Sequence, residues 1–299
     1  MSPKQLSALL ILSALWGGSF LFMRIAAPSL GPIVLIWLRV GLAGLALLGY
    51  GAVVGRLARP GRLWKEYLVI GAINSALPFC LIAFSSVTLP ASMTAPLNAT
   101  TPLFGAVIAA VWIGETLTVR KVLGLLMGVV GVAVLMGLGP IPWSGDTMLA
   151  AGASLLAAVS YGVGAVYTKA RVQGGDARVL STYSQLFAAL LLTPLVPFAW
   201  PQATPSGEVV ISVVALAILC TSVGYLLYFY LIMTAGPTRA TMVTYLSPAF
   251  GMLWGTLLLN ERLGVASFVG FGLILASVGL VTGAGRLREG RGSLGKQVG

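Results

Sequence analysis

Long apolar runs alternate with short polar segments along almost the whole chain. A helix that rises 1.5 Å per residue needs about 20 apolar residues to cross the hydrocarbon core of a bilayer. Ten runs of roughly that length lie near residues 5–27, 32–54, 67–87, 91–113, 119–138, 147–168, 178–199, 209–232, 239–259 and 264–283. The pattern predicts an all-α integral membrane protein with ten transmembrane helices and little structure outside the bilayer.

One region of the chain is written twice. The segment 102–137 reads PLFGAVIAAVWIGETLTVRKVLGLLMGVVGVAVLMG, and 146 positions later the chain reads PAFGMLWGTLLLNERLGVASFVGFGLILASVGLVTG. The alignment has no gap, and it pairs Pro102 with Pro248 and Glu115 with Glu261. A repeat of this length inside an apolar chain indicates a membrane protein built from two similar halves.

The earlier runs agree with this duplication at an offset of 145, where Trp16-Gly17 matches Tyr161-Gly162. Each half then holds five spans, and because five is odd, the second half enters the membrane from the opposite side. Inverted repeats of this kind are typical of transporters that bind substrate where the repeats meet. We expect a central cavity between a first five-helix repeat (1–140) and an inverted second repeat (141–285), followed by a basic cytoplasmic tail (286–299).

The basic residues test the topology. Of the 18 Lys and Arg residues, 15 lie in one alternate set of connections, whereas the other set holds only Arg24 and Arg262, and Arg39 lies inside the second run. Since basic loops favour the cytoplasmic side, both termini should be cytoplasmic. The net charge of +11 therefore reflects membrane topology, and we expect no nucleic-acid partner.

Composition excludes several classes of protein. Mean hydropathy is +0.98 and only 8% of residues are charged, against about 25% in soluble domains. The chain has no His, and its two cysteines, Cys80 and Cys220, lie in apolar runs, so metal sites, cofactors and Cys/His catalysis are not expected. No P-loop or filter-like loop is present, which disfavours an ATP-driven pump or a channel. The first run is too long for a signal-peptide core and is expected to remain as a helix.

Several motifs resemble a known group. The paired PLFG…GE and PAFG…NE blocks, the early WGGSF segment and Trp37-Leu38-Arg39 resemble the drug/metabolite transporter superfamily, specifically its ten-helix, two-repeat EamA type. The resemblance covers residues 5–283 and is strongest to bacterial inner-membrane exporters of amino acids, including aromatic ones. It implies export of small metabolites by alternating access, around a cavity lined by the first, third, fourth, sixth, eighth and ninth spans.

Candidate site residues gather around Pro102 and Pro248, which lie at matching mid-span positions. Proline removes a backbone hydrogen bond, so these two are expected to form kinks or hinges near a site, although kinks can also serve helix packing alone. The predicted substrate-binding residues are Trp16, Phe79, Asn98, Thr101, Tyr161, Tyr225, Tyr245 and Ser247. The alternatives are interhelical hydrogen bonds for the polar members and an interfacial belt for the aromatic ones.

Three charged residues are expected in gating or structural ion pairs. Glu115 and Glu261 end their spans on opposite faces of the membrane, next to basic residues such as Lys121. Arg39 lies within its span, where a charge needs a partner or a water path, and it could either guide carboxylates or extend to the surface. No Asp or Glu lies at mid-membrane, which argues against a proton-driven multidrug pump.

The resulting hypothesis is a secondary transporter that exports amino acids, including aromatic or large neutral ones, or related small metabolites. We expect it to act as a monomer in the lipid bilayer, without a cofactor and without enzymatic activity. The alternative is an exporter of drugs or hydrophobic organic cations, in which the aromatic side chains would form the cation-binding surface.

The inverted repeat can be tested by cysteine accessibility. Single cysteines introduced next to Glu115 and next to Glu261 should react with a membrane-impermeant thiol reagent from opposite sides of the membrane. Reaction of both positions from the same compartment would contradict the inversion.

Overall fold

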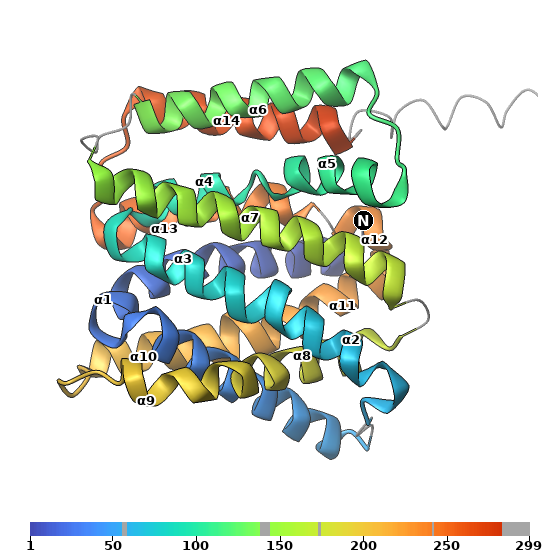
Figure 1. Ribbon diagram of the computed structural model, residues 1–299, viewed down its shortest axis with the longest axis vertical. Helices are drawn as coiled ribbons and strands as arrows, with labels where there is room; N and C mark the ends of the chain where they lie inside the picture. The colour runs from blue at the N-terminus through green and yellow to red at the C-terminus, as the bar shows by residue number, and fades with distance from the viewer. Residues whose placement is uncertain (56–58, 138–143, 173–174, 241, 283–299) are drawn as a thin grey trace, which may run out of the picture.

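The computed structural model describes residues 1–55, 59–137, 144–172, 175–240 and 242–282, and within these ranges all regular secondary structure is helical (Figure 1). The predicted all-α fold class is therefore confirmed. The expected boundary between the repeats at residue 140 and the basic tail 286–299 lie outside the described residues.

The helices follow the ten apolar runs, several of them in more than one piece. The elements are α1 (Pro3–Val53), η1 (Gly61–Leu63), α2 (Trp64–Gly71), η2 (Ala72–Ala76), α3 (Leu77–Thr88), α4 (Ala91–Asn98), α5 (Thr101–Ile113), α6 (Val119–Gly137), α7 (Gly145–Arg171), α8 (Ala177–Leu192), η3 (Thr193–Leu195), α9 (Val196–Ala199), α10 (Gly207–Val214), η4 (Ala215–Val223), α11 (Gly224–Ala235), α12 (Pro237–Ala240), α13 (Val243–Leu259) and α14 (Val265–Thr282).

The number of spans agrees with the prediction of ten. Eight helical stretches are long and apolar enough to cross a membrane, and α13, with 17 residues, is a shorter apolar helix. The 51-residue α1 supplies two spans, because its backbone leaves the helical region at Gly31 (φ 69°, ψ 160°), between Pro28 and Pro32. Glycine adopts a positive φ without a steric penalty, and Pro32 has no N–H to continue the hydrogen-bond ladder.

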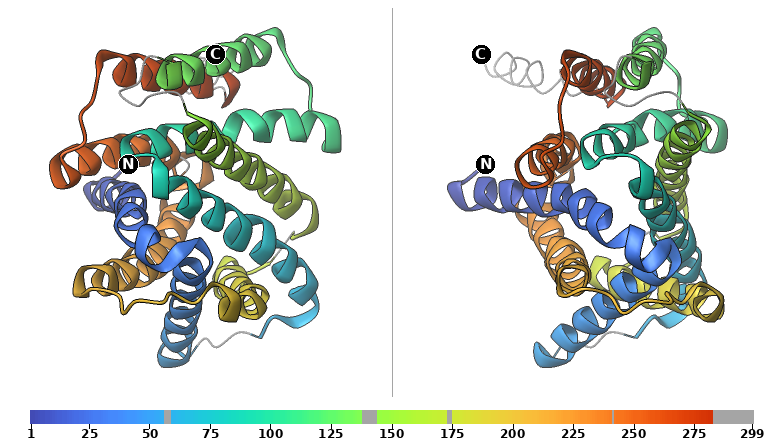
Figure 2. Two further views of the ribbon diagram at one scale, coloured as in Figure 1. Left: turned by 60° about the vertical axis from the view of Figure 1, so that its left-hand side comes forward. Right: turned by 90° about the vertical axis from the view of Figure 1, so that its left-hand side faces the viewer.

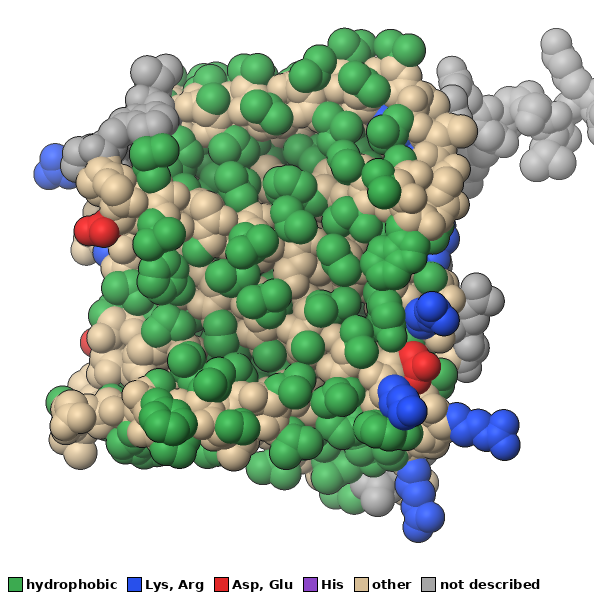
Figure 3. All heavy atoms as spheres, viewed as in Figure 1, with side chains coloured by type: hydrophobic (Ala, Val, Ile, Leu, Met, Phe, Trp, Pro, Cys, Tyr) green, Lys and Arg blue, Asp and Glu red, His purple; other side chains and the backbone are tan. Residues whose placement is uncertain are grey.

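The helices lie side by side in a bundle. In Figure 1, α1 runs through the middle of the bundle, where it packs against α13, η4 and α8, while α6 and α14 pair at one end of the long axis. The two turned views in Figure 2 show the same α6–α14 pair set apart from the remaining helices. Apolar side chains cover the broad face in Figure 3, and most Lys and Arg in that view lie along its right-hand edge, as expected for a protein embedded in lipid.

Glycines bring the two repeats into close contact at matching places. A Cβ added at Gly17 of α1 would lie 2.6 Å from Phe250 Cβ and 2.7 Å from the backbone nitrogen of Gly251 in α13. A Cβ added at Gly162 of α7 would lie 2.8 Å from the backbone nitrogen of Gly105 in α5. Gly105 and Gly251 are 146 residues apart, so both seams use the same positions of the repeat. Small residues allow such close approach, which stabilises helix pairs in lipid.

Two π-helical segments also occupy matching positions, a feature that the sequence analysis did not predict. Residues 72–76 of η2 fall, after a shift of 146, inside η4. In a π-helix the carbonyl of Ile73 would accept from residue 78, but Pro78 has no N–H to donate. The Ser160 hydroxyl donates to this carbonyl instead, at 2.6 Å. At η2, a hydroxyl from α7 thus replaces the donor that Pro78 lacks.

The two predicted kinks differ in the structure. The fourth span is interrupted between α4 and α5, and Pro102 lies in the first turn of α5 just after the break. Pro248 instead lies inside the continuous helix α13. The Pro102 position fits the rule that proline is tolerated in a first helical turn, where its missing N–H costs nothing.

The close approach at Gly17 generates a stability prediction with a neighbouring control. Gly17→Ala should destabilise the protein by about 1–3 kcal/mol, because the new methyl group meets backbone atoms that cannot rotate away. Gly18→Ala should be nearly neutral, since the nearest atom to its Cβ is 3.6 Å away on Phe22. Thermal unfolding in detergent checks both variants, and equal melting temperatures would contradict the close packing of α1 on α13.

Candidate functional site

A buried arginine lies at the centre of the bundle. Arg39, in the second half of α1, has 4% of its surface exposed, and its Nε donates to Thr221 Oγ1 of η4 at 3.1 Å. Its Cζ lies 3.9 Å from the ring centroid of Phe79 in α3, and its Nη1 lies 3.6 Å from the Met23 sulfur. Among the described residues, which include six of the seven acidic ones, no carboxylate pairs with Arg39.

A glutamine occupies the equivalent place in the second repeat. Gln185 of α8 follows Arg39 by 146 residues and is fully buried. Its Nε2 donates to Ser75 Oγ of η2 at 3.0 Å and to the Tyr225 hydroxyl of α11 at 3.4 Å. The same offset of 146 relates the partners of the two residues. Ser75 is equivalent to Thr221, and Phe79 is equivalent to Tyr225. The site is therefore a pair of equivalent three-residue clusters related by the duplication, and in each a π-helix provides the hydroxyl.

Aromatic rings from four spans line the same region. Trp16 of α1 lies 6.4 Å from Tyr225 and 5.3 Å from Tyr228, measured between ring centroids. Tyr161 of α7 lies 6.3 Å from Phe79 in an edge-to-face arrangement. The structure thus brings together four of the eight predicted substrate-binding residues, from the first, third, sixth and eighth spans.

The other four predicted residues lie elsewhere. Thr101 donates to the Asn98 carbonyl at 2.8 Å across the break between α4 and α5, and the buried side-chain oxygen of Asn98 has no partner among the described residues. The Tyr245 hydroxyl bonds to the Thr282 hydroxyl at the end of α14, away from the central arginine. Ser247 is buried in α13, and its carbonyl lies against Gly17.

The sequence analysis did not identify Ser75, Gln185 and Thr221, and it gave Arg39 a gating or ion-pair role. The signal for these residues is positional, since Arg39 and Gln185, like Ser75 and Thr221, are separated by the offset of the longer repeat. Because neither pair is identical in chemistry, a search for matching letters passes over both.

Glu261 holds a helix end at one face of the bundle. Its carboxylate accepts from the backbone N–H groups of Ala91 at 2.8 Å and Ser92 at 2.9 Å, at the start of α4. This places a negative charge at the positive end of a helix and satisfies two N–H groups that have no partner within it. Gly255 leaves the space for this carboxylate, because a side chain there would collide with the Glu261 oxygen.

Arg24 holds the preceding helix at the same corner. Its Nη1 donates to the carbonyls of Ser86 at 2.8 Å and Val87 at 2.6 Å, at the end of α3. Together Arg24 and Glu261 fix both ends of the connection between α3 and α4. Ala95 of α4 packs directly on Gly251 of α13, so α4 and α13 are in close contact.

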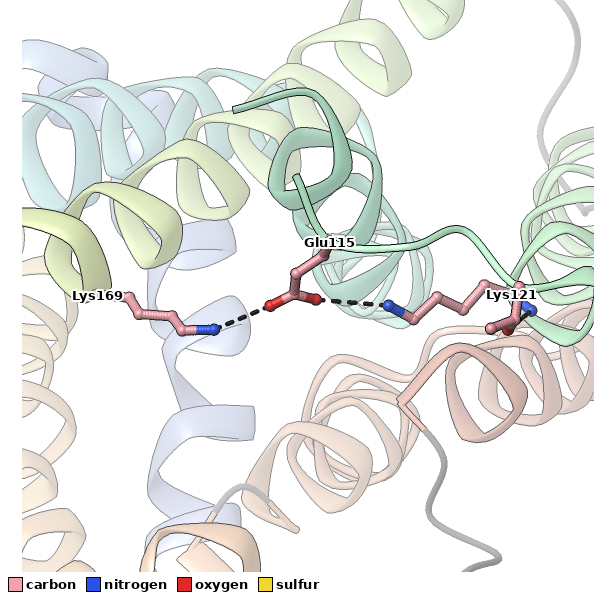
Figure 4. Close-up of polar contacts among 4 residues, drawn as sticks. Glu115, Lys121 and Lys169 are labelled. Atoms are coloured by element: carbon pink, nitrogen blue, oxygen red, sulfur yellow. Dashed lines mark hydrogen bonds and ion pairs between the residues drawn. The ribbon is translucent and has the colours of Figure 1, made fainter. Parts of the chain in front are cut away.

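Glu115 is held differently at the other face (Figure 4). Its carboxylate pairs with Lys169 Nζ at 2.9 Å and with Lys121 Nζ at 3.4 Å. Hydrogen bonding from Lys169, with smaller contributions from Lys121, lowers the pKa of the Glu115 carboxyl below its ordinary value. The carboxyl therefore remains ionised at neutral pH.

The left-handed residue before each glutamate explains the paired G-E and N-E motifs. Gly114 (φ 71°) and Asn260 (φ 54°) end α5 and α13 in the left-handed region. In each copy the N–H of the following glutamate bonds to the carbonyl six residues back, on Ala109 or on Gly255. Glycine and asparagine are the residues that adopt this conformation most readily. They therefore end each helix directly before its glutamate.

The Glu115 face is open. A groove of about 410 Å³ runs beside α5, α7 and the end of α14, with Lys121 and Lys169 among its lining residues. The offset of 146 makes α12 equivalent to α4 and α5 equivalent to α13. In the described residues, α12 and α5 make little or no contact with each other. The two ends of the bundle therefore differ, since α4 packs on α13 toward Glu261, whereas a groove lies beside Glu115.

Comparison with known proteins agrees with this architecture. The chain is 25% identical over 286 residues to a Bacillus subtilis protein named uncharacterized transporter YvbV, covering 93% of this chain and 92% of that one. It is 26% identical over 281 residues to the uncharacterized inner membrane transporter YedA of Escherichia coli, covering 92% and 89%. It is 25% identical over 292 residues to an E. coli protein named probable amino-acid metabolite efflux pump, covering 93% and 94%.

A solved crystal structure has the same fold, with a TM-score of 0.65 and 21% identity over 94% of this chain and 99% of that one. The family model of EamA-like transporters matches the chain twice, over residues 4–137 and 148–283. The duplicated ten-span bundle, its interior site and these matches together show that the chain is a multi-pass membrane transporter of the EamA-like transporter family.

Proposed function

We propose that this protein exports amino acids, including large neutral or aromatic ones, or closely related small metabolites, across a bacterial inner membrane. The observation that carries the proposal is the buried pair of clusters from the two repeats, in which Arg39 and Gln185 lie among aromatic rings and no acidic side chain of the described residues is present. Aromatic walls favour a substrate with a large apolar side chain, and buried polar groups favour one with a polar end. The similarity to a probable amino-acid metabolite efflux pump supports the same substrate class.

An exporter of hydrophobic organic cations is the second candidate, because aromatic rings attract cations. The central charge distinguishes the two. The guanidinium of Arg39 repels a cation, and the described residues supply no carboxylate at the site to offset that repulsion. The electrostatics therefore favour zwitterionic or anionic substrates.

The unequal ends of the bundle support alternating access as the mechanism. The many basic residues at the termini and at the Glu115 face support a cytoplasmic location for both, so the open groove faces the cytoplasm. Glu261 and Arg24 then form a closed periplasmic gate. In the opposite state, the two-fold relationship between the repeats would transfer the helix-capping role from Glu261 to Glu115.

At the cytoplasmic end, the equivalent interaction of Glu115 with a helix N-terminus would be weaker. The equivalents of Ala91 and Gly255, 146 residues away, are Pro237 and Ala109. Pro237 has no N–H to donate to a carboxylate, and the methyl group of Ala109 occupies the space that Gly255 leaves open. The inward-facing state is therefore favoured at rest, which suits a protein that collects its substrate from the cytoplasm.

Weakening the periplasmic lock should shift the protein outward. Glu261→Gln removes the charge that holds two N–H groups, so the outward-facing population should rise about tenfold. The measurement is periplasmic thiol labelling of Asn98→Cys in a variant without Cys80 and Cys220. Glu115→Gln is the matched control and should not accelerate labelling. An unchanged rate in Glu261→Gln would contradict the gate.

Transport in reconstituted vesicles tests the proposed function. A counterflow panel should show saturable exchange of at least one of the 20 amino acids and no preference for organic cations. Tyr161→Ala removes one wall of the site and should lower the rate about tenfold. Phe198→Ala, at a side chain that is 91% exposed, is the control. Full transport by a folded Tyr161→Ala protein would place the substrate elsewhere.

A further inference from the structure

We propose that the central site is polarised, so that Arg39 binds the carboxylate of the substrate and Gln185 accepts a hydrogen bond from its ammonium group. This inference rests on the proposed function and adds the chemical class and orientation of the ligand. The substrate would be an α-amino acid that lies between the two equivalent clusters, with one charged end toward each repeat.

Within the part of the chain that the structure describes, Arg39 has no anionic partner. The groups around its guanidinium are the Thr221 hydroxyl, the Met23 sulfur and the Phe79 ring, all of them neutral. A buried cation at membrane depth is stable only when it is paired or reaches water. The guanidinium carries five N–H donors, and Thr221 occupies only the one on Nε, so the terminal nitrogens retain donors in the fork geometry that matches a carboxylate.

Two contacts fix this guanidinium in place. The Phe79 ring covers one of its faces, while the Thr221 hydroxyl accepts from Nε and itself donates to the Leu216 carbonyl at 2.7 Å, five residues back in the π-helix. A cation held by stacking and by an oriented hydroxyl needs little rearrangement to bind an anion. The arrangement resembles a binding group more closely than a side chain extended toward the surface.

Gln185 presents the complementary group. Its Nε2 is bonded to Ser75 and Tyr225, but its Oε1 is buried and has no hydrogen-bond partner among the described residues. An unpaired buried acceptor is costly, and each N–H of an ammonium group can satisfy it. The Tyr225 ring also lies 6.4 Å from the Trp16 ring, so the amide cluster borders the aromatic wall of the site.

The duplication explains why the two ends differ. A fully symmetric site would carry the same residue at positions 39 and 185 and could not distinguish the two ends of a ligand. Here the framework is equivalent on both sides, since a π-helix hydroxyl and an aromatic ring accompany each residue. Only the central residue differs, a cationic Arg39 in one cluster and a neutral Gln185 in the other. This difference would fix which end of a bound amino acid lies toward which repeat.

The test uses three probes of one shape in proteoliposome counterflow: L-phenylalanine, its amide without a carboxylate, and 3-phenylpropionate without an amine. Arg39→Gln should raise KM about 10- to 100-fold for the two carboxylates, and it should not raise KM for the amide, which has no carboxylate to bind. Gln185→Leu should raise KM for the two amines and leave 3-phenylpropionate unchanged. Arg62→Gln, at an exposed arginine of η1, is the control.

The equivalence of the clusters allows a second, sharper variant. In the double variant Arg39→Gln and Gln185→Arg, the new arginine would meet Ser75 and Tyr225, so recognition of L-phenylalanine should return to within about tenfold of the original KM. Size-exclusion chromatography and circular dichroism establish that each variant is folded. A folded Arg39→Gln protein with unchanged KM for both carboxylates overturns the proposal, as does a double variant no better than the single one.

Failure of the proposed function gives a different result. If none of the 20 amino acids is exchanged, binding is measured by thermal shift with 3-phenylpropionate alone. Stabilisation of the original protein but not of folded Arg39→Gln would support the carboxylate site while rejecting amino-acid export. Equal stabilisation of both proteins, or none of either, would overturn the role of Arg39.

Discussion

A bilayer offers the backbone no water, and this constraint organises the molecule. Several points at which the described chain departs from a regular helix have a partner from another helix or connection. The Ile73 carbonyl, left without an N–H by Pro78, accepts from Ser160, and the ends of α3 and α4 are held by Arg24 and Glu261. Irregular backbone in lipid persists only where it is satisfied in this way, so the irregular points mark where polar side chains had to be placed. The central site and the closed gate are both built at such points.

The duplication supplies a common framework, and side-chain differences give it a function. Paired glycines, paired π-helices and paired left-handed helix ends recur at a separation of 145 or 146 residues. Against this background, few substitutions are needed to make the halves unequal. Arg39 of the first repeat corresponds to Gln185 of the second, and Ala109 at one end of the bundle corresponds to Gly255 at the other. The first difference puts a charge in one cluster only, and under the proposed mechanism the second makes one gate easier to close than the other.

Much of the fold follows from the chain alone, because the constraint behind it is simple. Length and hydropathy identify the spans, and the pairing of Trp16-Gly17 with Tyr161-Gly162 locates helices that do meet the opposite repeat at equivalent glycines. The aromatic cluster could also be predicted, because comparing the two repeats matches aromatic residues at equivalent positions. Its members are Trp16, Phe79, Tyr161 and Tyr225.

Other parts of the site could not be read from residue types. The partners of Glu261 are backbone N–H groups, which every residue except proline carries, so the residue types do not identify them. The π-helices depend on local hydrogen bonding that a hydropathy pattern does not reveal. Tyr245 was grouped with the cavity because of its neighbours in sequence, yet the rotation of α13 turns it toward Thr282. Gln185 corresponds to Arg39 only through the 146-residue offset. Because the two side chains differ in type, the sequence gave no reason to pair them.

The pairing of α6 with α14 has a consequence for motion. These helices come from opposite repeats, and Gly124 meets Ser277 while its counterpart Gly270 meets Gly131, so the same contact occurs twice about a common axis. The helix backbones approach closely there, because a Cβ added at Gly124 would lie 3.0 Å from the Ser277 carbonyl oxygen and one added at Gly270 would lie 2.9 Å from the Gly131 carbonyl oxygen. Under the proposed alternating access, a pair packed this closely would keep its geometry while the rest of the bundle tilts around it. The α6–α14 pair would then be the pivot of the movement.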